Sequence, residues 1–438
     1  MNEEFLKTMQ DLLKDEYPEY LKCLAQPARR GFRVNTLKTS SEDLFEVMDV
    51  PHEKSPFADN GYYTDAPAGI GYTPAYLAGT FYMQEPSASS AVTILDPKPG
   101  MKVLDLCAAP GSKSTQILEK LQNQGLLVSN EIDRKRAKIL LENIERNGAA
   151  NAIVLNDNTD TVADTFPEYF DAVLCDAPCS GEGMMRKEKE ASAQWSRDLV
   201  RHCASLQKDI LDNAYRCLKK GGTLVYSTCT LNIHENEEQI LSFLERHPDM
   251  HMEDPHVSFG RNGFLKEKGI DHSVRIFPMD GGEGHFVAKM HKDGMSQEYE
   301  RPVMKSETLH RDLKEMLSDD LNTVYPFLFL KNGRLYGGTH AFIDTGKCHV
   351  LRNQTYIGEA KKGRFDYAYP AFLSSYAHFS RHYDLDEEET KRYLHGEQIP
   401  ASVPKGWYAM CYHGYALGGA KSDGKALKNH YPKSYRFR

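Results

Sequence analysis

Two cysteines occupy short polar loops, and each loop follows an apolar run of strand type. The first loop reads DAPCSGEG and contains Asp176 and Cys179, and the second reads STCT and contains Cys229. A thiol that acts as a nucleophile needs a polar, partly exposed position, and strand ends beside helix N-termini provide such positions. Adjacent parallel strands lie about 5 Å apart, so the two thiols and the carboxylate can share one pocket mouth. The pattern indicates nucleophilic chemistry at sulfur.

A third loop indicates a bound nucleoside. It reads DLCAAPGSKS from Asp105 to Ser114, between an apolar run and a helix. Small residues let the backbone approach a ligand closely, and the first N–H groups of the helix are free. A phosphate loop would need glycine where Ser112 precedes Lys113, and a Gly-x-Gly-x2-Gly fingerprint is absent from the loop. A nucleoside with an amino-acid tail suits the loop better than a triphosphate, although an ordinary strand-to-helix turn would look similar.

Acidic residues at the next two strand ends extend this site. Glu131 stands about twenty residues on, where a carboxylate can accept hydrogen bonds from both hydroxyls of an unphosphorylated ribose. Asp157 ends the third strand, where it can accept from an adenine amino group. The acids together describe an adenosyl site, and the predicted cofactor-binding residues are Cys107, Ala108, Ala109, Pro110, Gly111, Ser112, Lys113, Glu131, Asp157 and Asp176.

The elements that must position these loops follow an alternating pattern. Helical patterns such as residues 134–147 alternate with short apolar runs at 103–107, 126–131, 152–155, 170–176 and 222–227. This alternation is typical of a doubly wound parallel sheet, whose ligands bind beyond the carboxyl ends of the strands. We therefore predict an α/β, Rossmann-like catalytic domain over residues 96–293, with every polar loop at one edge.

A small N-terminal α/β domain is expected over residues 1–95. Its first helical stretch is predicted to break at Pro18. Residues 31–37 alternate like a strand, and Thr39 and Glu42 have the spacing of a capping box for another helix.

Two further modules are expected after a polar linker. Residues 305–380 have the pattern of a small mixed α/β domain, and residues 381–438 that of a β-rich module with many glycines and tyrosines. The acidic run at 386–389 is predicted to start a short helix.

Composition and charge limit the class of protein. The chain has 438 residues, nine cysteines and a formal net charge of −8. No apolar run approaches the roughly 20 residues of a membrane span, and the N-terminus lacks the regions of a secretory signal. We therefore expect a cytoplasmic protein with free thiols. Cys175 and Cys179 lack a second Cys/His pair at zinc-site spacing, so no metal is expected.

Basic residues gather at the two ends of the chain. The N-terminal cluster is Arg29, Arg30, Arg33 and Lys38, and six Lys and Arg residues follow position 420. Each cluster is either a set of phosphate contacts that position a nucleic acid without reading its sequence or a solvated surface. Arg186 and Lys187 are either a further phosphate contact or a surface pair.

At the two cysteine motifs and the cofactor loop, the chain resembles the RNA cytosine-5 methyltransferases of the Sun-type family. Within that family it is similar to the bacterial branch that methylates small-subunit ribosomal RNA. Further likeness lies in RVNT from Arg33, in YMQEPS from Tyr82 and in the segment from Arg275 to Phe286. Ser112 departs from the second glycine of many relatives.

The resemblance is close over residues 30–290 and weaker towards the C-terminus. Residues 414–431 resemble an RNA-binding module related to PUA domains. The likeness implies a class I S-adenosylmethionine methyltransferase fold with PUA-like C-terminal modules, S-adenosylmethionine as cofactor, and ribosomal RNA or the small ribosomal subunit as partner. We expect no membrane partner, and a monomer is favoured although the sequence does not determine the oligomeric state.

The predicted catalytic residues are Cys229, Cys179, Asp176 and Lys113, and the resemblance implies the roles of the two cysteines. Carbon 5 of cytosine is a poor nucleophile, and a thiolate added to carbon 6 enriches it in electrons. Cys229 is predicted to make this attack, Asp176 to bond the base edge, and Cys179 to assist product release. Lys113 is expected either to hold Asp176 or position the base, or simply to be solvated. The target cytosine must be unpaired or flipped out.

Several alternatives stay open at this point. DNA cytosine-5 methyltransferases use a cysteine that corresponds to Cys179, although the STCT loop favours Cys229. The same chemistry could act on transfer RNA, and a catalytically silent assembly factor is the non-enzymatic alternative.

Overall fold

The protein is described by a computed structural model over residues 2–66, 69–187, 193–297, 299–361 and 364–437. Its largest sheet has ten strands in the order β11-β12-β13-β9-β8-β5-β6-β7-β16, with β10 (Met250–Met252) paired to β13. The five strands in its middle run parallel to one another. They are β5 (Lys102–Asp105), β6 (Leu126–Asn130), β7 (Ala152–Leu155), β8 (Phe170–Asp176) and β9 (Leu218–Thr228).

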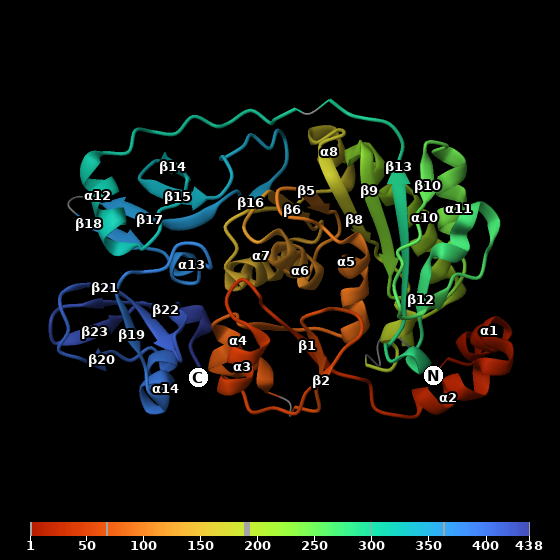
Figure 1. Cartoon of the computed structure of the whole chain (residues 1–438), viewed down its shortest axis with the longest axis horizontal. Helices are drawn as coiled ribbons and strands as arrows, with labels where there is room; N and C mark the ends of the chain where they lie inside the picture. Colours follow the sequence, from red (N-terminus) through yellow and green to blue (C-terminus); the bar gives the residue numbers. More distant parts are fainter. Residues whose placement is uncertain (1, 67–68, 188–192, 298, 362–363, 438) are drawn as a thin grey trace.

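Helices connect these parallel strands and cover the sheet (Figure 1). They are α6 (Ser112–Leu121), α7 (Arg134–Asn147), α8 (Thr159–Thr165) and α10 (Arg197–Cys217). Successive side chains along each strand point to opposite faces of the sheet. Val103 therefore packs in one apolar cluster and its neighbour Leu104 in another. The predicted doubly wound α/β fold is confirmed.

Antiparallel strands complete the sheet beyond β9. After α11 (Glu237–Arg246) the chain returns through β11 (Arg261–Asn262), β12 (Val274–Ile276) and β13 (His285–Lys292). The strand β13 lies antiparallel to β9. It is the long arrow next to β9 in Figure 1. This arrangement leaves the carboxyl ends of β5 to β9 open towards the N-terminal segment.

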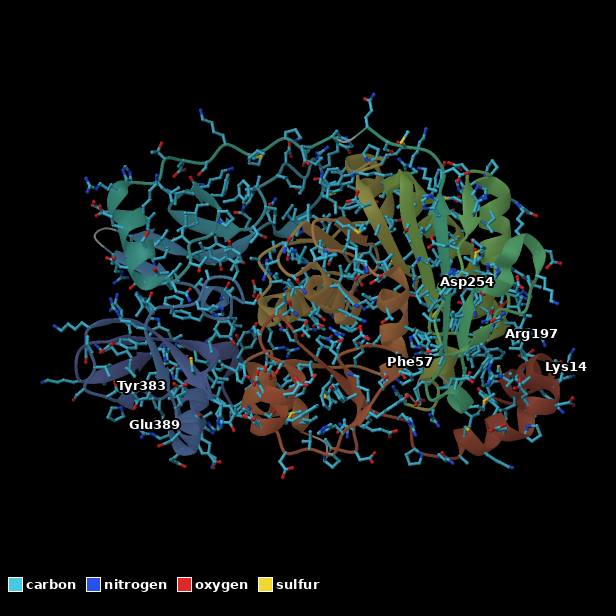
Figure 2. All side chains as sticks on the ribbon, viewed as in Figure 1. Lys14, Phe57, Arg197, Asp254, Tyr383 and Glu389 are labelled. Carbon is cyan, nitrogen blue, oxygen red and sulfur yellow. The ribbon has the colours of Figure 1, made fainter. Side chains whose placement is uncertain are left out.

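The N-terminal segment contains a second sheet, in the order β2-β3-β1-β4. Its strands are β1 (Gly31–Val34), β2 (Glu53–Lys54), β3 (Gly61–Tyr63) and β4 (Phe81–Met83), and the segment also holds α3 (Ser41–Val47), α4 (Pro74–Leu77) and α5 (Ser90–Leu95). Figure 2 labels Phe57, which lies between this segment and the large sheet. Its ring is completely buried in the same cluster as Val103 and Leu118, so the two parts share one core.

Two details of the N-terminal segment differ from the sequence prediction. The first helical stretch consists of α1 (Glu3–Leu13) and α2 (Tyr17–Leu24), and it breaks at a 3-10 turn rather than at Pro18. Pro18 lies in the first turn of α2, where its missing N–H costs nothing. The helix α3 is capped by Ser40, whose Oγ accepts from the N–H of Asp43 at 3.0 Å, instead of by the predicted pair Thr39 and Glu42.

The C-terminal third contains two smaller sheets. One has the order β14-β15-β17-β18 and the other the order β19-β21-β22-β23-β20. The first comprises β14 (Phe327–Lys331), β15 (Arg334–Gly338), β17 (Thr355–Lys361) and β18 (Arg364–Tyr367), with α12 (Arg311–Asp320) and α13 (Tyr369–Phe372) beside it. The second comprises β19 (His382–Asp384), β20 (Ile399–Pro400), β21 (Gly406–Tyr412), β22 (Tyr415–Ser422) and β23 (Ala426–Asn429).

Two features of this third bear on the sequence analysis. The predicted acidic helix start is present, because Asp386 caps α14 (Glu387–His395) in a capping box with Glu389. One strand was not foreseen: β16 (Val350–Arg352) leaves its neighbours and pairs antiparallel with β7 at the edge of the large sheet.

Candidate active site

The three predicted loops lie at the carboxyl ends of β5, β8 and β9, and Glu131 follows the end of β6. The side chains of Asp176 and Lys113, which are 63 residues apart, are joined by an ion pair of 2.7 Å between Oδ2 and Nζ. The sulfur atoms of Cys179 and Cys229 lie 3.3 Å apart although 50 residues separate them. The parallel arrangement therefore brings the predicted catalytic side chains to one place.

The two thiols form a directly contacting pair. Both are free and partly buried. The hydrogen bond to Cys229 raises the pKa of Cys179 well above its usual value, and burial raises it further. Cys179 therefore stays protonated, and its sulfur lies within hydrogen-bond distance of the Cys229 sulfur.

Asp176 is held by a partner on each carboxylate oxygen. Ser227 donates to Oδ1 at 2.7 Å, and Lys113 pairs with Oδ2. Burial opposes the charge on Lys113, but the carboxylate of Asp176 overcomes that effect and raises the lysine pKa. The side chain of Asp176 is 30% exposed while that of Lys113 is 9% exposed, so the carboxylate faces the mouth with its ammonium partner behind it.

Asp105, at the end of β5, is completely buried. Ser114 donates to its Oδ2 at 2.6 Å, whereas Oδ1 has no hydrogen-bond partner among the described residues. Burial raises the pKa of Asp105 to about 7, against the lowering effect of the Ser114 hydrogen bond. A buried acid with one unused oxygen is well placed to receive a polar group of a ligand.

The other two acids lie at the ends of β6 and β7. Glu131 is 3% exposed, accepts from the N–H of Asp133 at 2.9 Å and pairs with Arg136 at 3.2 Å. Asp157 is partly buried, and its Oδ2 accepts from the N–H of His349 at 3.0 Å. That last contact comes from the C-terminal third of the chain and could not be read from local sequence.

The loop of residues 106–113 is fixed through its backbone carbonyls. Arg136 donates to the carbonyl of Ala109 at 2.7 Å, and Asn143 donates to that of Pro110 at 2.8 Å, so α7 clamps the loop from one side. Gly111 precedes α6 with a φ of +109°, which only glycine adopts readily. No side chain caps α6, so its first N–H groups are directed at the site.

Other predicted members of the loop contribute shape more than polarity. Ala108 is buried, and its N–H is bonded to the carbonyl of Asn130 at 2.8 Å. The carbonyl of Ser112 accepts from Arg33 at 3.1 Å. Cys107 is partly buried, and burial together with the surrounding carboxylates raises its pKa, so this thiol stays neutral.

Glu235 holds the two cysteine loops together, and the sequence analysis missed it. Its Oε2 accepts from the N–H of Ser180 at 2.9 Å, next to Cys179, and its Oε1 accepts from Asn232 at 2.8 Å, beyond Cys229. Ser180 and Thr230 also join the loops directly through their hydroxyls at 2.8 Å. In the sequence Glu235 is one of several acids near a helix start, which is a common surface pattern, so nothing local distinguished it.

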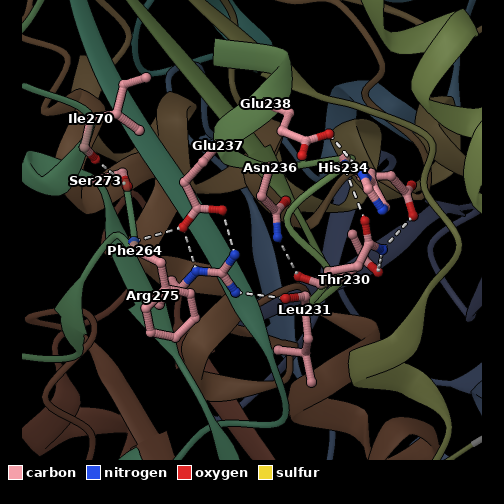
Figure 3. A network of polar contacts seen from close by, with 12 residues as sticks. Thr230, Leu231, His234, Asn236, Glu237, Glu238, Phe264, Ile270, Ser273 and Arg275 are labelled. Atoms are coloured by element: carbon pink, nitrogen blue, oxygen red, sulfur yellow. Dashed lines mark hydrogen bonds and ion pairs between the residues drawn. The ribbon is translucent and has the colours of Figure 1, made fainter. Parts of the chain in front are cut away.

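A buried ion pair supports the loop after Cys229 (Figure 3). Arg275 on β12 donates its Nε to Glu237 at 2.6 Å and its Nη1 to the carbonyl of Leu231 at 2.6 Å. The two charged side chains are 1% and 0% exposed. The segment that the sequence analysis recognised around Arg275 therefore supports the thiol loop without contacting the thiols.

The predicted phosphate contacts of Arg33 and Lys38 are wrong, and neither alternative left open for Arg186 holds, because all three cations are used inside the protein. Arg33 is completely buried and pairs with Glu119 through two nitrogen atoms. The Nζ of Lys38 donates to two backbone carbonyls, and burial lowers its pKa to about 7. Arg186 forms two hydrogen bonds to Glu283 at 2.8 and 2.6 Å.

Metal and membrane features are absent from the part of the chain that the structure describes. No group of three or more His, Cys, Asp or Glu side chains has the arrangement to hold a metal ion there. Nor does any helix in those ranges combine the length and apolar character needed to cross a bilayer.

Comparisons with known proteins decide the family. Residues 92–291 match the family model of the 16S rRNA methyltransferase RsmB/F, residues 1–86 match the N-terminal domain of 16S rRNA methyltransferase RsmF, and residues 380–437 match its PUA domain. A ribosomal RNA small subunit methyltransferase F of Shewanella sp. (strain MR-7) is 32% identical, over 99% of this chain and 96% of that protein. The chain belongs to the 16S rRNA methyltransferase F family.

A further relative and two solved structures are also similar to this chain. The protein of that name from Escherichia coli O127:H6 is 37% identical over 66% of this chain and 62% of its own. A crystal structure of a methyltransferase homologue from Pyrococcus horikoshii is 29% identical, with a TM-score of 0.58 over 67% of this chain and all of the other. An NSun6 structure from the same organism, at 22% identity and a TM-score of 0.59 over 66% of this chain and 98% of the other, shows the same fold.

Proposed function

We propose that this member of the family methylates carbon 5 of cytosines in 16S ribosomal RNA, with S-adenosylmethionine as donor and Cys229 as covalent nucleophile. The observation that carries the proposal is the contact of 3.3 Å between the Cys179 and Cys229 sulfur atoms, beside the ion pair of Asp176 and Lys113. Cys179 stays protonated next to Cys229. This arrangement is consistent with Cys229 as the attacking sulfur. Methylation of carbon 5 is a reaction that needs such a nucleophile.

The residues at the ends of β5, β6 and β7 fit an adenosyl cofactor with an amino-acid tail. The unpartnered Oδ1 of Asp105 would accept from the ammonium group of the tail. The buried carboxylate of Glu131 retains acceptor capacity for the ribose hydroxyls, and Asp157 for the adenine amino group. When bound, the cofactor supplies an electrophilic methyl group.

Cys229 performs the first step on the base. Its thiolate adds to carbon 6 of the cytosine, and the electrons of the double bond move towards carbon 5, which then accepts the methyl group. Cys179 contacts this sulfur at 3.3 Å before attack and so orients it. The ammonium of Lys113 interacts electrostatically with the Cys229 sulfur.

Asp176 stabilises the intermediate at the opposite edge of the ring. Each of its oxygens already has one donor, from Ser227 and Lys113, and each retains a lone pair for the base. These lone pairs accept from the protonated N3 and from the exocyclic amino group of the adduct. The proton on carbon 5 then leaves, the double bond re-forms and the Cys229 sulfur is expelled, a stage to which we assign Cys179.

Trapping the covalent adduct tests this assignment. Cys179→Ala keeps the nucleophile but loses the group assigned to the last stage, so we expect a protein–RNA adduct that survives denaturing electrophoresis. Cys229→Ala is expected to form none. The reverse pattern would exchange the roles of the two cysteines, and no adduct with either variant would remove the covalent mechanism.

The RNA substrate needs a separate experiment. Methyl incorporation by the purified protein into 16S ribosomal RNA and into bulk transfer RNA is expected to favour the former. Bisulfite mapping of ribosomal RNA from a strain that lacks the protein is expected to reveal the lost 5-methylcytosine. Methylation of transfer RNA alone would contradict the proposed substrate.

A further inference from the structure

An aromatic cleft lies where the N-terminal segment, α7 and the C-terminal module meet. Its volume is about 420 Å³, and side chains from all three parts line it. Figure 1 shows the C-terminus next to α4, at the same end of the molecule as the N-terminal segment that faces the active-site edge. The proposed mechanism does not use this cleft.

One wall of the cleft carries a free aromatic ring. Tyr72 is 73% exposed and stacks on no other ring within the described ranges. Behind it the ring of Tyr76 is covered by the guanidinium of Arg146 at 3.9 Å. On the far side Tyr369 and Tyr435 pack with ring centroids 5.7 Å apart. Aromatic rings and guanidinium planes are the surfaces on which RNA-binding proteins stack unpaired bases.

Two carboxylates, Glu142 and Glu145, line the cleft from α7, and Glu142 interacts with Tyr435. No hydrogen bond or ion pair engages the side chain of Glu145 within the ranges that the structure covers. Burial raises the pKa of Glu145, which indicates that water solvates the group poorly. Glu145 is partly exposed in the cleft, so its carboxylate oxygens can accept from a ligand that brings its own donors.

The four RNA bases differ in what they present to such a carboxylate. Guanine carries a ring N–H next to an amino group on its Watson–Crick edge, so that two adjacent donors can reach the two oxygens together. Adenine and cytosine place an amino group beside a ring acceptor, and uracil places its ring N–H between two carbonyls. Only guanine matches both oxygens without a repulsive contact.

We propose that this cleft binds an unpaired guanine of the substrate RNA, with the base stacked on Tyr72 and its Watson–Crick edge at Glu145. The proposal rests on the proposed action on RNA. Arg436 lines the cleft, and Lys433 is exposed in the adjoining turn η7 (Lys433–Tyr435). Arg436 donates to the carbonyl of Tyr431 at 3.2 Å, and both cations would contact the phosphates of a bound nucleotide.

The cleft is also connected to the cofactor loop. Asn143 lines it and donates to the carbonyl of Pro110 at 2.8 Å, while Arg146 donates to the Oδ1 of Asn143 at 2.8 Å. A guanine in the cleft therefore lies one side chain away from the loop that is proposed to hold the methyl donor. Binding there would hold the RNA on the face on which the target cytosine must enter.

The experiment titrates the full-length protein with the four nucleoside 5′-monophosphates at up to millimolar concentration and follows ligand signals by saturation-transfer NMR. We expect saturable binding of guanosine monophosphate, about tenfold tighter than the other three, as one bidentate pair allows. Gly71→Leu is expected to fill the mouth and abolish the preference. A Cβ added there meets no heavy atom within 4 Å, so we expect the fold to tolerate the substitution.

A second variant tests the acceptor itself. Glu145→Gln keeps the shape of the side chain but puts an amide donor against the donors of guanine, and we expect about a tenfold loss for guanosine monophosphate alone. Glu46→Gln, an exposed glutamate on α3, is the matched control and should bind as the unaltered protein does.

Two results would overturn the proposal. One is equal or undetectable binding of the four nucleotides by the unaltered protein, and the other is an unchanged guanine preference in both cleft variants. Methyl incorporation into 16S ribosomal RNA is measured on the same preparations. A protein that methylates RNA but shows no guanine preference refutes the cleft alone, whereas a protein that prefers guanine but methylates no RNA refutes the proposed function.

Discussion

Replacing Asp105 by asparagine is expected to make the protein more stable, by an amount that depends on pH. Burial raises the pKa of this carboxyl from 3.8 to about 7 in the folded protein. Below pH 3.8 the carboxyl is protonated in both the folded and the unfolded protein, so it does not lower the free energy of unfolding. Between the two values the unfolded chain releases its proton while the folded protein retains it, and unfolding becomes easier by about 1.4 kcal/mol per pH unit.

The penalty stops growing above the folded-state pKa. A shift of this size corresponds to about 4 kcal/mol at pH 8, because Asp105 is completely buried and water does not screen it. For a domain of the catalytic domain's size this corresponds to a melting temperature roughly 10 °C higher for Asp105→Asn than for the unaltered protein. The asparagine oxygen can still accept from Ser114, so its other effects do not vary with pH.

The assay is thermal unfolding of both proteins without cofactor, from pH 5 to pH 8.5. The difference in melting temperature is expected to widen up to about pH 7 and then to level off. Asp59→Asn, at a side chain that is 97% exposed, is the control and should show no such trend. A difference in melting temperature that stays constant across the range would refute the argument that burial raises the pKa of Asp105.

Cofactor binding gives the same argument a second readout. If the ionised carboxylate receives the ammonium group of the tail, the affinity for S-adenosylhomocysteine should rise about tenfold between pH 6 and pH 8. Asp105→Asn should bind more weakly and lose this dependence. Affinity that is flat with pH in the unaltered protein would place the ammonium group elsewhere.

Three other predictions concern the groups around the thiols. Lys113→Met removes the cation that pairs with Asp176, and methyl transfer should slow on the order of a hundredfold with little change in cofactor affinity; Lys113→Arg should restore part of the rate. Arg275→Met leaves a buried carboxylate without its partner, so the unfolding free energy should fall by about 3–5 kcal/mol, measured by urea denaturation against the exposed Arg197→Met. Glu235→Gln replaces the acceptor that joins the two cysteine loops, and the adduct yield should drop while S-adenosylhomocysteine binding stays constant; an unchanged yield would contradict its positioning role.

The predicted sheet was recoverable from sequence because its signal is local. Buried parallel strands give short apolar runs, and the limits of α7 and β7 follow from a clear change of period. The acids at the strand ends could likewise be anticipated, since topology alone brings such loops to one edge.

Long-range partnership was not recoverable. Arg33 and Arg186 look like surface cations in the sequence, and only the fold places Glu119 and Glu283 against them. Glu235 gives no local signal either, because its donors come from segments up to 55 residues away. From sequence alone a charged side chain is expected to be exposed to solvent. Only the folded structure shows which distant residue neutralises it.

The strand β16 makes the catalytic sheet depend on a distant part of the chain. It covers β7, which would otherwise present an unpaired edge to other molecules, and the residue before it bonds Asp157. A protein shortened to its first 300 residues would therefore expose an unpaired edge at β7 and lose the backbone N–H that bonds Asp157. Aggregation and weakened nucleoside affinity should appear together in such a fragment, and a short peptide that spans residues 345–355 would relieve both.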